Sequence, residues 1–239
     1  MKSEKEAVRE TEEFYNSNSF DVPKQFKNKQ EERFKKLKIN FPETGKAIDV
    51  GAGSGRSSRA LRKMRPNLDI TCLDIAKKSI DRLKEFKRIH ASALNIPFED
   101  ETFDVVISVG CLHHTPNAKK GFEECCRILK PGGILVIALY NKWTIYPILY
   151  KIGKRLPGFI KRKIKIPIVQ DQFFTPHASF HSPKEVKEWF EQNGIEFKKL
   201  LGTGYITPYF PNKLCQFIYY YGIKKEHKEK QELQQSKHI

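Results

Sequence analysis

The sequence predicts an α/β fold in which helices cover both faces of a mostly parallel sheet. From Lys46 onward, short apolar segments alternate with amphipathic charged segments. This alternation is typical of parallel strands joined by crossover helices. The first apolar segment, residues 46–50, leads directly into three alternate glycines. Glycine lets a backbone turn sharply and approach a ligand closely, so the same segment predicts a binding site at the end of a strand.

Two segments precede this first strand, and we expect residues 1–45 to form a helical cover. Residues 1–20 are highly charged and show no clear apolar period. Residues 24–40 are predicted to form an amphipathic helix, because Phe26, Phe34 and Leu37 can share one of its faces.

The remaining elements follow from apolar runs and turn signals. Strands are predicted near 46–50, 68–73, 87–91, 103–109, 133–139, 195–201 and 214–221. Helices are predicted near 55–64, 76–86 and 117–129, and the turn Pro131-Gly-Gly133 ends the last of them. A further helix begins at Ser182, since Ser182-Pro-Lys-Glu185 is a capping box with proline at the first helical position, and Asn193-Gly194 ends it.

Residues 142–181 are too long for a plain connection after the fifth strand. Residues 143–156 are apolar and aromatic, and no acidic residue occurs between Lys142 and Pro167. The basic residues that follow are Lys161, Arg162, Lys163 and Lys165. We therefore predict a basic, amphipathic cap. Residues 46–141 are then the core, residues 182–223 complete the same domain, and the polar residues 224–239 are predicted to be disordered.

Composition excludes some classes of protein. With 239 residues, 39% hydrophobic and 30% charged, the chain suits one domain with an ample core. No apolar stretch approaches the ~20 residues of a spanning helix, and the first ten residues lack the apolar core of a secretory signal. The five cysteines are odd in number and have no Cys-x-x-Cys spacing, so we expect reduced thiols, no metal site and a cytoplasmic protein. The basic, amphipathic cap would allow peripheral association with a membrane.

The net charge of +16 has two interpretations. A basic surface attracts nucleic acid, anionic lipid or acidic substrates. A lysine-rich proteome would produce the same charge without any bearing on function. Composition alone leaves both open.

The glycine turn defines the expected ligand more closely. Asp49 precedes Gly51, Gly53 and Gly55, and Asp74 ends the next apolar run. A carboxylate about 20 residues after such a turn can accept the hydroxyl protons of a ribose. The third glycine follows the second by only two positions, which excludes the dinucleotide fingerprint. No Gly-Lys-Ser/Thr follows, which excludes a nucleoside-triphosphate loop.

These residues resemble a known family. Asp49-Val-Gly-Ala-Gly-Ser-Gly55 is similar to the first motif of the class I S-adenosylmethionine-dependent methyltransferases, and Leu73-Asp74 to the second. Residues 91–108 resemble the third motif and fourth strand, and residues 129–138 the turn into the fifth strand. The closest resemblance is to the type 11 branch, which includes ubiquinone- and menaquinone-type methyltransferases.

The resemblance implies a Rossmann-like, seven-stranded sheet, mostly parallel, whose last two strands form an antiparallel hairpin at the edge. It also implies that S-adenosyl-L-methionine is the cofactor. The amino-terminal segment of the family commonly covers cofactor and substrate, a role that Tyr15, Phe20 and Phe26 could take here. Such aromatic residues more often pack a helix onto the sheet.

The resemblance also assigns cofactor contacts. Asp49 is expected to reach the methionine amino group, directly or through water, Asp74 to hold the ribose diol and Ile75 to lie against adenine. Ser92 stands where the family often has an aspartate facing the adenine amino group. The full set of expected cofactor residues is Asp49, Gly51, Ala52, Gly53, Gly55, Asp74, Ile75, Ser92, Ala93, Leu94, Val109 and Gly110.

Acceptor residues leave a weaker signal. His113 and His114 resemble paired histidines of small-molecule branches, and His114 is the candidate catalytic base because imidazole titrates near neutral pH. The alternative is that one histidine bonds the backbone and the other packs. Cys111 is taken as a packing residue. The residues expected to contact substrate are His113, Tyr140, Asn141, His177 and His181.

Three functions remain open at this point. The leading hypothesis is a methyltransferase acting on a small or lipid-like acceptor. The second is a methyltransferase acting on RNA, such as tRNA, through the basic cap. The third is a non-catalytic module that attaches to a membrane or a protein, with an anionic lipid surface as the possible partner. The acceptor itself cannot be deduced from the fold.

Overall fold

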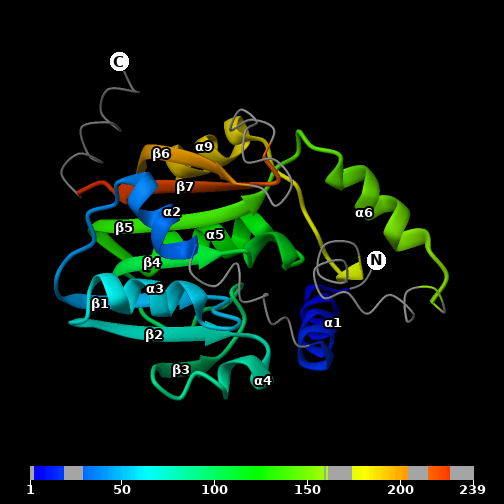
Figure 1. Cartoon of the computed structure of the whole chain (residues 1–239), viewed down its shortest axis with the longest axis horizontal. Helices are drawn as coiled ribbons and strands as arrows, with labels where there is room; N and C mark the ends of the chain where they lie inside the picture. Colours follow the sequence, from blue (N-terminus) through cyan, green and yellow to red (C-terminus); the bar gives the residue numbers. More distant parts are fainter. Residues whose placement is uncertain (1–2, 19–28, 159, 161–173, 204–214, 227–239) are drawn as a thin grey trace.

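The computed structural model describes residues 3–18, 29–158, 160, 174–203 and 215–226. Its centre is a seven-stranded sheet in the order β3-β2-β1-β4-β5-β7-β6 (Figure 1). The strands are β1 (Gly45–Val50), β2 (Leu68–Asp74), β3 (Lys87–His90), β4 (Phe103–Val109), β5 (Leu129–Tyr140), β6 (Ile195–Thr203) and β7 (Phe217–Lys224).

The first five strands are parallel, and β7 runs antiparallel to both of its neighbours, β5 and β6. This confirms the predicted mostly parallel sheet with an antiparallel hairpin at one edge. The chain runs outward from β1 to β3 and then returns to place β4 on the other side of β1. In open α/β sheets, ligands bind at such a reversal, outside the carboxyl ends of the strands.

Helices cover both faces of the sheet. On one face lie α2 (Lys29–Leu37), α3 (Arg56–Met64) and the short α4 (Lys77–Ile80), and on the other α5 (Ala118–Arg127) and α9 (Pro183–Gln192) (Figure 1). The helices α1 (Glu4–Ser17) and α6 (Tyr146–Arg155) lie towards the carboxyl ends of the parallel strands (Figure 1). A short 3-10 helix, η2 (Leu112–His114), follows β4.

Two hydrophobic cores result, one on each face. In β5, Leu135 and Ile137 belong to one core, whereas Val136 and Ala138 belong to the other. Because a central parallel strand is buried on both faces, it appears in the sequence as a continuous apolar run. The Rossmann-like fold expected from the resemblance is therefore confirmed, both in the order of the strands and in the helical layer on each face of the sheet.

The capping box before α9 is present as predicted. Ser182 Oγ accepts a hydrogen bond from the amide of Glu185, and the Glu185 carboxylate accepts one from the amide of Ser182. A second capping box, between Ser3 and Glu6, begins α1. Helix α1 agrees with the helical cover expected over residues 1–45, although the apolar pattern of residues 1–20 does not predict its position.

Three element bounds also differ from the prediction. The helix expected over 76–86 is α-helical only over α4, and the chain continues through turns in which Leu83 N bonds Ile80 O and Phe86 N bonds Leu83 O. Apolar residues spaced by three suit such i to i−3 bonding. Strand β5 begins at Leu129 rather than near residue 133. The expected helix over 24–40 is observed as α2, and residues 24–28 lie outside the described residues.

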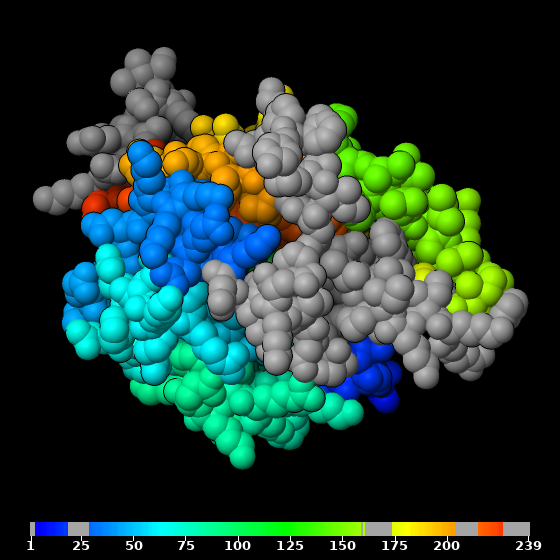
Figure 2. All heavy atoms as spheres, viewed as in Figure 1, coloured from blue at the N-terminus to red at the C-terminus, as the bar shows by residue number. Residues whose placement is uncertain are grey.

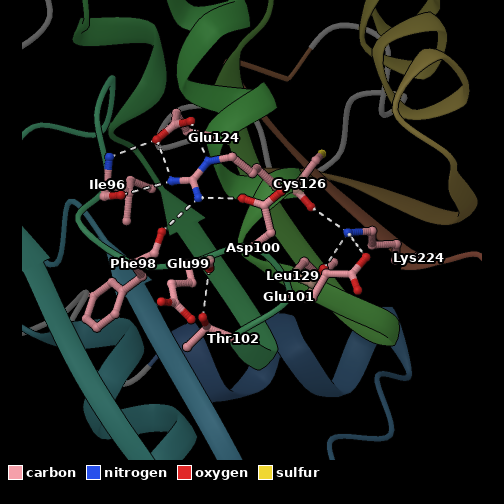
Figure 3. A network of polar contacts seen from close by, with 11 residues as sticks. Ile96, Phe98, Glu99, Asp100, Glu101, Thr102, Glu124, Cys126, Leu129 and Lys224 are labelled. Carbon is pink, nitrogen blue, oxygen red and sulfur yellow. Dashed lines mark hydrogen bonds and ion pairs between the residues drawn. The ribbon is translucent and has the colours of Figure 1, made fainter.

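Lys224 was assigned to the disordered tail, but it belongs to β7. Its ammonium donates to the carbonyls of Cys126 and Leu129, at 3.1 and 2.6 Å, and lies beside Glu101 (Figure 3). These bonds tie the last strand to the end of α5. Lys225 and Glu226 of the predicted tail are also described, and Lys225 N donates to Gly194 O at 2.9 Å; residues 227–239 lie outside the described residues.

The same region holds a second polar network around Arg127. Its guanidinium donates to the carbonyls of Ile96 and Phe98 and to the carboxylates of Asp100 and Glu124. Glu124 also accepts a hydrogen bond from the amide of Ile96 (Figure 3). The network fixes the segment between β3 and β4 against α5.

None of the described helices has the length and hydropathy that crossing a bilayer requires.

Candidate functional site

A cavity of about 980 Å³ lies at the carboxyl ends of β1, β2 and β4. Its wall includes the glycine turn after β1, the end of β2, Ser92–Ala93, Val109–Cys111 and His114–Pro116. The cavity is at the large end of the range for small-molecule sites, about 300–1,000 Å³. It therefore has room for a nucleoside-bearing cofactor and a second small molecule.

The glycine turn forms the floor of this cavity. The amides of Gly51 and Ala52 both donate to Leu73 O, at 2.7 and 3.0 Å, which joins the ends of β1 and β2. Gly51 has φ +75°, and a Cβ there would lie 2.3 Å from Cys111 Sγ. Gly53 has φ +53°, and a Cβ there would meet nothing within 4 Å. Gly53 therefore leaves an open cradle on the cavity floor into which a ligand fits.

Asp74 stands at the end of β2, beside that cradle. Its Oδ2 accepts a hydrogen bond from Gly53 N and its Oδ1 one from Ala76 N, both at 2.7 Å. Burial raises the pKa of this carboxyl, and the two backbone donors oppose that rise. Each carboxylate oxygen can accept more than one hydrogen bond, so Asp74 can bind a diol while it holds the turn. The cap on Ala76 and a ligand contact are therefore compatible.

Asp49 lies behind the turn and is not among the residues that line the cavity. Its Oδ2 accepts hydrogen bonds from the amide and the hydroxyl of Ser58, at 3.0 and 2.6 Å. Burial raises the pKa of Asp49 to about 6. In this structure Asp49 therefore joins β1 to α3, and its expected contact with the methionine amino group has no counterpart in the cavity wall.

The residues after β3 form the wall opposite α3. Ser92 and Ala93 line the cavity, whereas Leu94 is buried behind them. Ser92 Oγ accepts a hydrogen bond from the amide of Leu94. The polar network around Arg127 holds the chain that follows, which fixes the position of this wall.

His114 reaches the cavity from the 3-10 turn after β4. Its Nδ1 lies 3.1 Å from His177 O. A carbonyl only accepts, so Nδ1 carries the proton and the basic lone pair of the neutral ring is on Nε2. The ring packs edge-on against Tyr15 and Tyr140, with centroids 5.9 and 5.2 Å away.

The other expected acceptor residues lie behind His114 rather than on the cavity wall. His113 is fully buried against Tyr140, with ring centroids 3.8 Å apart, and burial lowers its pKa well below the usual value. Tyr140 in turn stacks on Phe180. His113 therefore packs against the ring of Tyr140 and does not line the cavity in which a ligand would bind.

Asn141 and His181 have structural partners of the same kind. Asn141 Nδ2 donates to Cys215 O and its Oδ1 accepts from Trp143 N. The ring nitrogens of His181 lie 2.8 Å from Glu185 Oε1 and from Ser179 Oγ. Together these side chains hold the end of β5, the segment before α9 and the start of β7. The sequence pattern could not separate them from His114, because a motif does not show which neighbouring groups a polar side chain meets in the folded protein.

The placement of the predicted cofactor residues divides in the same way. Those that line the cavity are Gly51, Ala52, Gly53, Asp74, Ile75, Ser92, Ala93, Val109 and Gly110, together with the candidate base His114. Those that do not are Asp49, Gly55 and Leu94, along with the candidate acceptor residues His113, Tyr140, Asn141, His177 and His181.

One wall of the cavity is formed by residues that, apart from Tyr15, are not among the predicted site residues. Val8, Thr11 and Tyr15 of α1 line it, as do basic residues of α3 that begin with Arg56. The spacing of Val8, Thr11 and Tyr15, together with the Ser3 capping box, is a helical signal that the high charge obscured. Tyr15 was expected to cover the site. Phe20 and Phe26, which shared that expectation, lie outside the described residues, as do Lys161, Arg162, Lys163 and Lys165 of the cap.

Comparison with known proteins gives consistent matches. The profile of the family described as "Methyltransferase domain" matches residues 48–137. Demethylmenaquinone methyltransferase of Staphylococcus aureus is 30% identical over 166 residues, which cover 63% of this chain and 67% of that protein.

Solved structures resemble the fold. An S-adenosylmethionine-dependent methyltransferase of Thermotoga maritima, described as a possible histamine N-methyltransferase, has a TM-score of 0.63 at 18% identity and covers 90% of this chain and 100% of its own. Phosphoethanolamine N-methyltransferase 2 of Haemonchus contortus, solved with S-adenosyl-L-methionine, has a TM-score of 0.60 at 15% identity and covers 94% of this chain and 58% of its own.

Proposed function

The chain belongs to the class I S-adenosylmethionine-dependent methyltransferases, and from that premise we propose that its acceptor is a lipid-like ring compound of the quinone type. The enzyme uses S-adenosyl-L-methionine as its methyl donor. The observation that carries the proposal is the 30% identity to a demethylmenaquinone methyltransferase over two thirds of that protein. Membership of a catalytic family favours an enzyme over the third hypothesis, a non-catalytic attachment module.

The cofactor fits the residues around the glycine turn. In our proposal Asp74 accepts the ribose hydroxyls, Ile75 and Ala93 enclose the adenine, and Gly53 gives the nucleoside its space. The open cradle at Gly53 and the two backbone donors that orient Asp74 support this assignment. Residues 46–141 then hold the cofactor, residues 1–45 cover it and residues 142–181 cap the acceptor.

The first turn of α3 suits the other end of the cofactor. Arg56 begins this helix and lines the cavity. A helix amino terminus presents free N–H groups and a partial positive charge, which favour a carboxylate. We assign the carboxylate of the methionine portion to this turn and to Arg56.

Once bound, the cofactor supplies a methyl group that its sulfonium has already activated. The protein must therefore align the acceptor with the breaking S–C bond and exclude water. Such positioning can supply up to about 7–11 kcal/mol of the barrier. The wall formed by Val8, Tyr15 and Pro116 is apolar and aromatic, which suits a flat ring.

In our proposal His114, which lines the cavity, acts as the general base. As the acceptor atom forms its bond to the methyl carbon, the S–C electron pair stays on sulfur and the acceptor must lose one proton. Nε2 of His114 takes that proton, because the carbonyl of His177 holds Nδ1 in its protonated form. The proton then passes to solvent.

The test is methyl transfer to a short-chain demethylated menaquinol, measured as labelled methyl groups in the organic phase. We expect transfer by the wild type. His114→Gln should lower kcat by about 10²–10⁴, the usual contribution of a general base, and leave the affinity for S-adenosylhomocysteine unchanged. A folded wild type that binds S-adenosylhomocysteine but methylates no quinol would contradict the acceptor proposal.

RNA remains the second candidate acceptor, because the net charge of +16 favours polyanions. The two candidates differ in their dependence on salt. Phosphate contacts make RNA binding fall steeply with ionic strength, whereas transfer to a neutral quinol should change little. Methylation of tRNA that falls steeply with added salt, with no transfer to quinol, would favour the RNA alternative.

A further inference from the structure

Exposed apolar side chains gather on one element. In the described part of the chain, the exposed large apolar residues all lie between residues 143 and 152: Trp143, Ile145, Ile148, Leu149 and Ile152. Trp143, Ile145 and Ile148 are each close to 60% exposed, at 58%, 61% and 59%. Figure 2 shows α6, in yellow-green, at the right margin of the surface. Clustered exposed apolar surface of this kind marks a site of interaction.

The exposed residues form a single stripe along α6. Ile145, Ile148, Leu149 and Ile152 are spaced by three, four and seven residues, which places them on one face of a helix. Another face holds the helix to the protein. Tyr150 Oη donates to the carbonyls of Thr175 and Pro176, each at 3.2 Å, in the segment that carries His177.

Gly153, the one α6 residue that is buried among those described, lies on the same side as Tyr146 and Tyr150 by the 100° turn of successive residues. The centre of the apolar stripe is therefore turned by about 115° from the side that attaches α6 to the protein, and Leu149, the least exposed of the four stripe residues, lies nearest to that side. Figure 1 shows α6 away from the sheet, at the edge of the molecule.

The charges around the stripe have one sign. From Lys142 to Gln170 the sequence has eight Lys or Arg residues and no Asp or Glu. Among them, Lys151 and Arg155 are exposed and flank the stripe on its outer side. Two copies of this chain that met through α6 would bring like charges together. A negatively charged partner with an apolar interior satisfies both the stripe and its flanks.

We propose that α6 docks on an anionic lipid bilayer, with its apolar stripe among the acyl chains and with Lys151 and Arg155 at the phosphates. A helix with an apolar face and Lys or Arg beside it lies in the headgroup region in this way. The proposal depends on α6 and not on the acceptor. If the acceptor is lipid-soluble, docking at α6 also brings the cavity to the surface where that acceptor is dissolved.

The chain carries a probe for this contact. It has two tryptophans, of which Trp143 is 58% exposed beside α6 and Trp189 is only 6% exposed within the core. Vesicles of equal parts phosphatidylcholine and phosphatidylglycerol should shift the emission of Trp143 to shorter wavelength. Bromine atoms on the acyl chains should quench that emission. Trp143→Phe keeps Trp189 as the background, and its spectrum should not change with vesicles.

Two double variants separate the apolar and the charged contributions. Ile148→Ser with Ile152→Ser should lower vesicle binding at least tenfold. Lys151→Gln with Arg155→Gln should weaken it about fivefold for each charge removed, from about 1 kcal/mol per basic residue near an anionic surface. Because these side chains are exposed, neither variant should change thermal unfolding or S-adenosylhomocysteine binding.

The matched control removes the same charge elsewhere. Lys78→Gln with Lys84→Gln changes two exposed lysines in and after α4 and should leave vesicle binding unchanged. Three results would overturn the proposal. They are no binding by folded wild type, equal loss in the control and the α6 variants, or equal binding to vesicles of phosphatidylcholine alone. A Trp143 shift that depends on protein concentration without vesicles, with dimers in sedimentation, would assign the stripe to a second copy instead.

Discussion

Asp49→Asn should make the protein more stable at neutral pH, although it alters the most deeply placed carboxylate of the glycine turn. Asp49 is 3% exposed and accepts its two hydrogen bonds from Ser58. The amide oxygen of asparagine can accept both of these bonds. The substitution therefore removes the buried charge and keeps the contacts, and burial of that charge is the largest cause of the raised pKa.

The magnitude follows from the pKa. Burial raises the pKa of Asp49 from 3.8 to about 6, which corresponds to about 3 kcal/mol at 1.36 kcal/mol per pH unit. Between these two values the folded protein binds a proton that the unfolded chain has released, so wild-type stability falls as pH rises through this window. The variant lacks this loss. It should match the wild type near pH 4 and exceed it by up to about 3 kcal/mol above pH 6.

Urea unfolding from about pH 4 to 8 measures this difference, and subtracting the two proteins removes most other titrating groups. Asp104→Asn is the control with the opposite sign. Its hydrogen bonds from Lys130 and from the amide of Lys46 lower the pKa of Asp104, so its contribution is lost only as pH falls below about 4. That variant should be less stable by a constant amount over the range. A constant difference for Asp49→Asn, or a variant less stable at pH 8, would refute the reasoning.

Three further predictions concern the glycine turn on the cavity floor and the polar network around Arg127. A Cβ on Gly51 would lie 2.3 Å from Cys111 Sγ, so Gly51→Ala should lower both the melting temperature and cofactor affinity. Gly53→Ala, which meets no atom within 4 Å, should cost only about 1–2 kcal/mol of left-handed strain while it greatly weakens S-adenosylhomocysteine binding in a calorimeter. Equal effects of the two variants on binding and stability would contradict this account. Arg127→Met should lower stability by about 1–3 kcal/mol, because it leaves the partly buried Glu124 and the carbonyls of Ile96 and Phe98 without their donor; a melting temperature within a degree or so of wild type would argue that the network is dispensable.

The parallel core was the part of the fold that the sequence predicted best. β1, β2 and β4 are buried over most of their length, so apolar residues predominate in them, and each strand ends in aspartate or is followed by glycine. The capping box at Ser182 defined α9 because its two hydrogen bonds are local in sequence. By contrast, α4 ends after four residues. The burial of Leu83 and Phe86, rather than the helix propensity of residues 81–86, determines the backbone conformation of that segment.

In the candidate site, too, the residues that belong to local motifs could be predicted, whereas those that depend on contacts distant in sequence could not. Asp74 and Gly53 were identifiable because each belongs to a motif at the carboxyl end of one of two neighbouring parallel strands, and the hydrogen bond between them is observed. Asp49 shares the motif, but its side chain points to Ser58, and alternation along a strand cannot show which neighbour a carboxylate meets. The contribution of α1 depends on contacts distant in sequence, such as that of Tyr15 with His114, which no local pattern contains.

The central claim is that the cavity beside Asp74 binds S-adenosylmethionine. Its most direct test is calorimetric titration with S-adenosylhomocysteine of the wild type, Asp74→Ala and Asp69→Ala. Asp69 is on the same strand but exposed, where it pairs with Lys87, so its loss should not change binding. A charge-assisted hydrogen bond contributes about 1.5–3 kcal/mol, and Asp74→Ala should therefore bind at least tenfold more weakly. Absence of binding by folded wild type, or equal binding by all three proteins, would contradict the account.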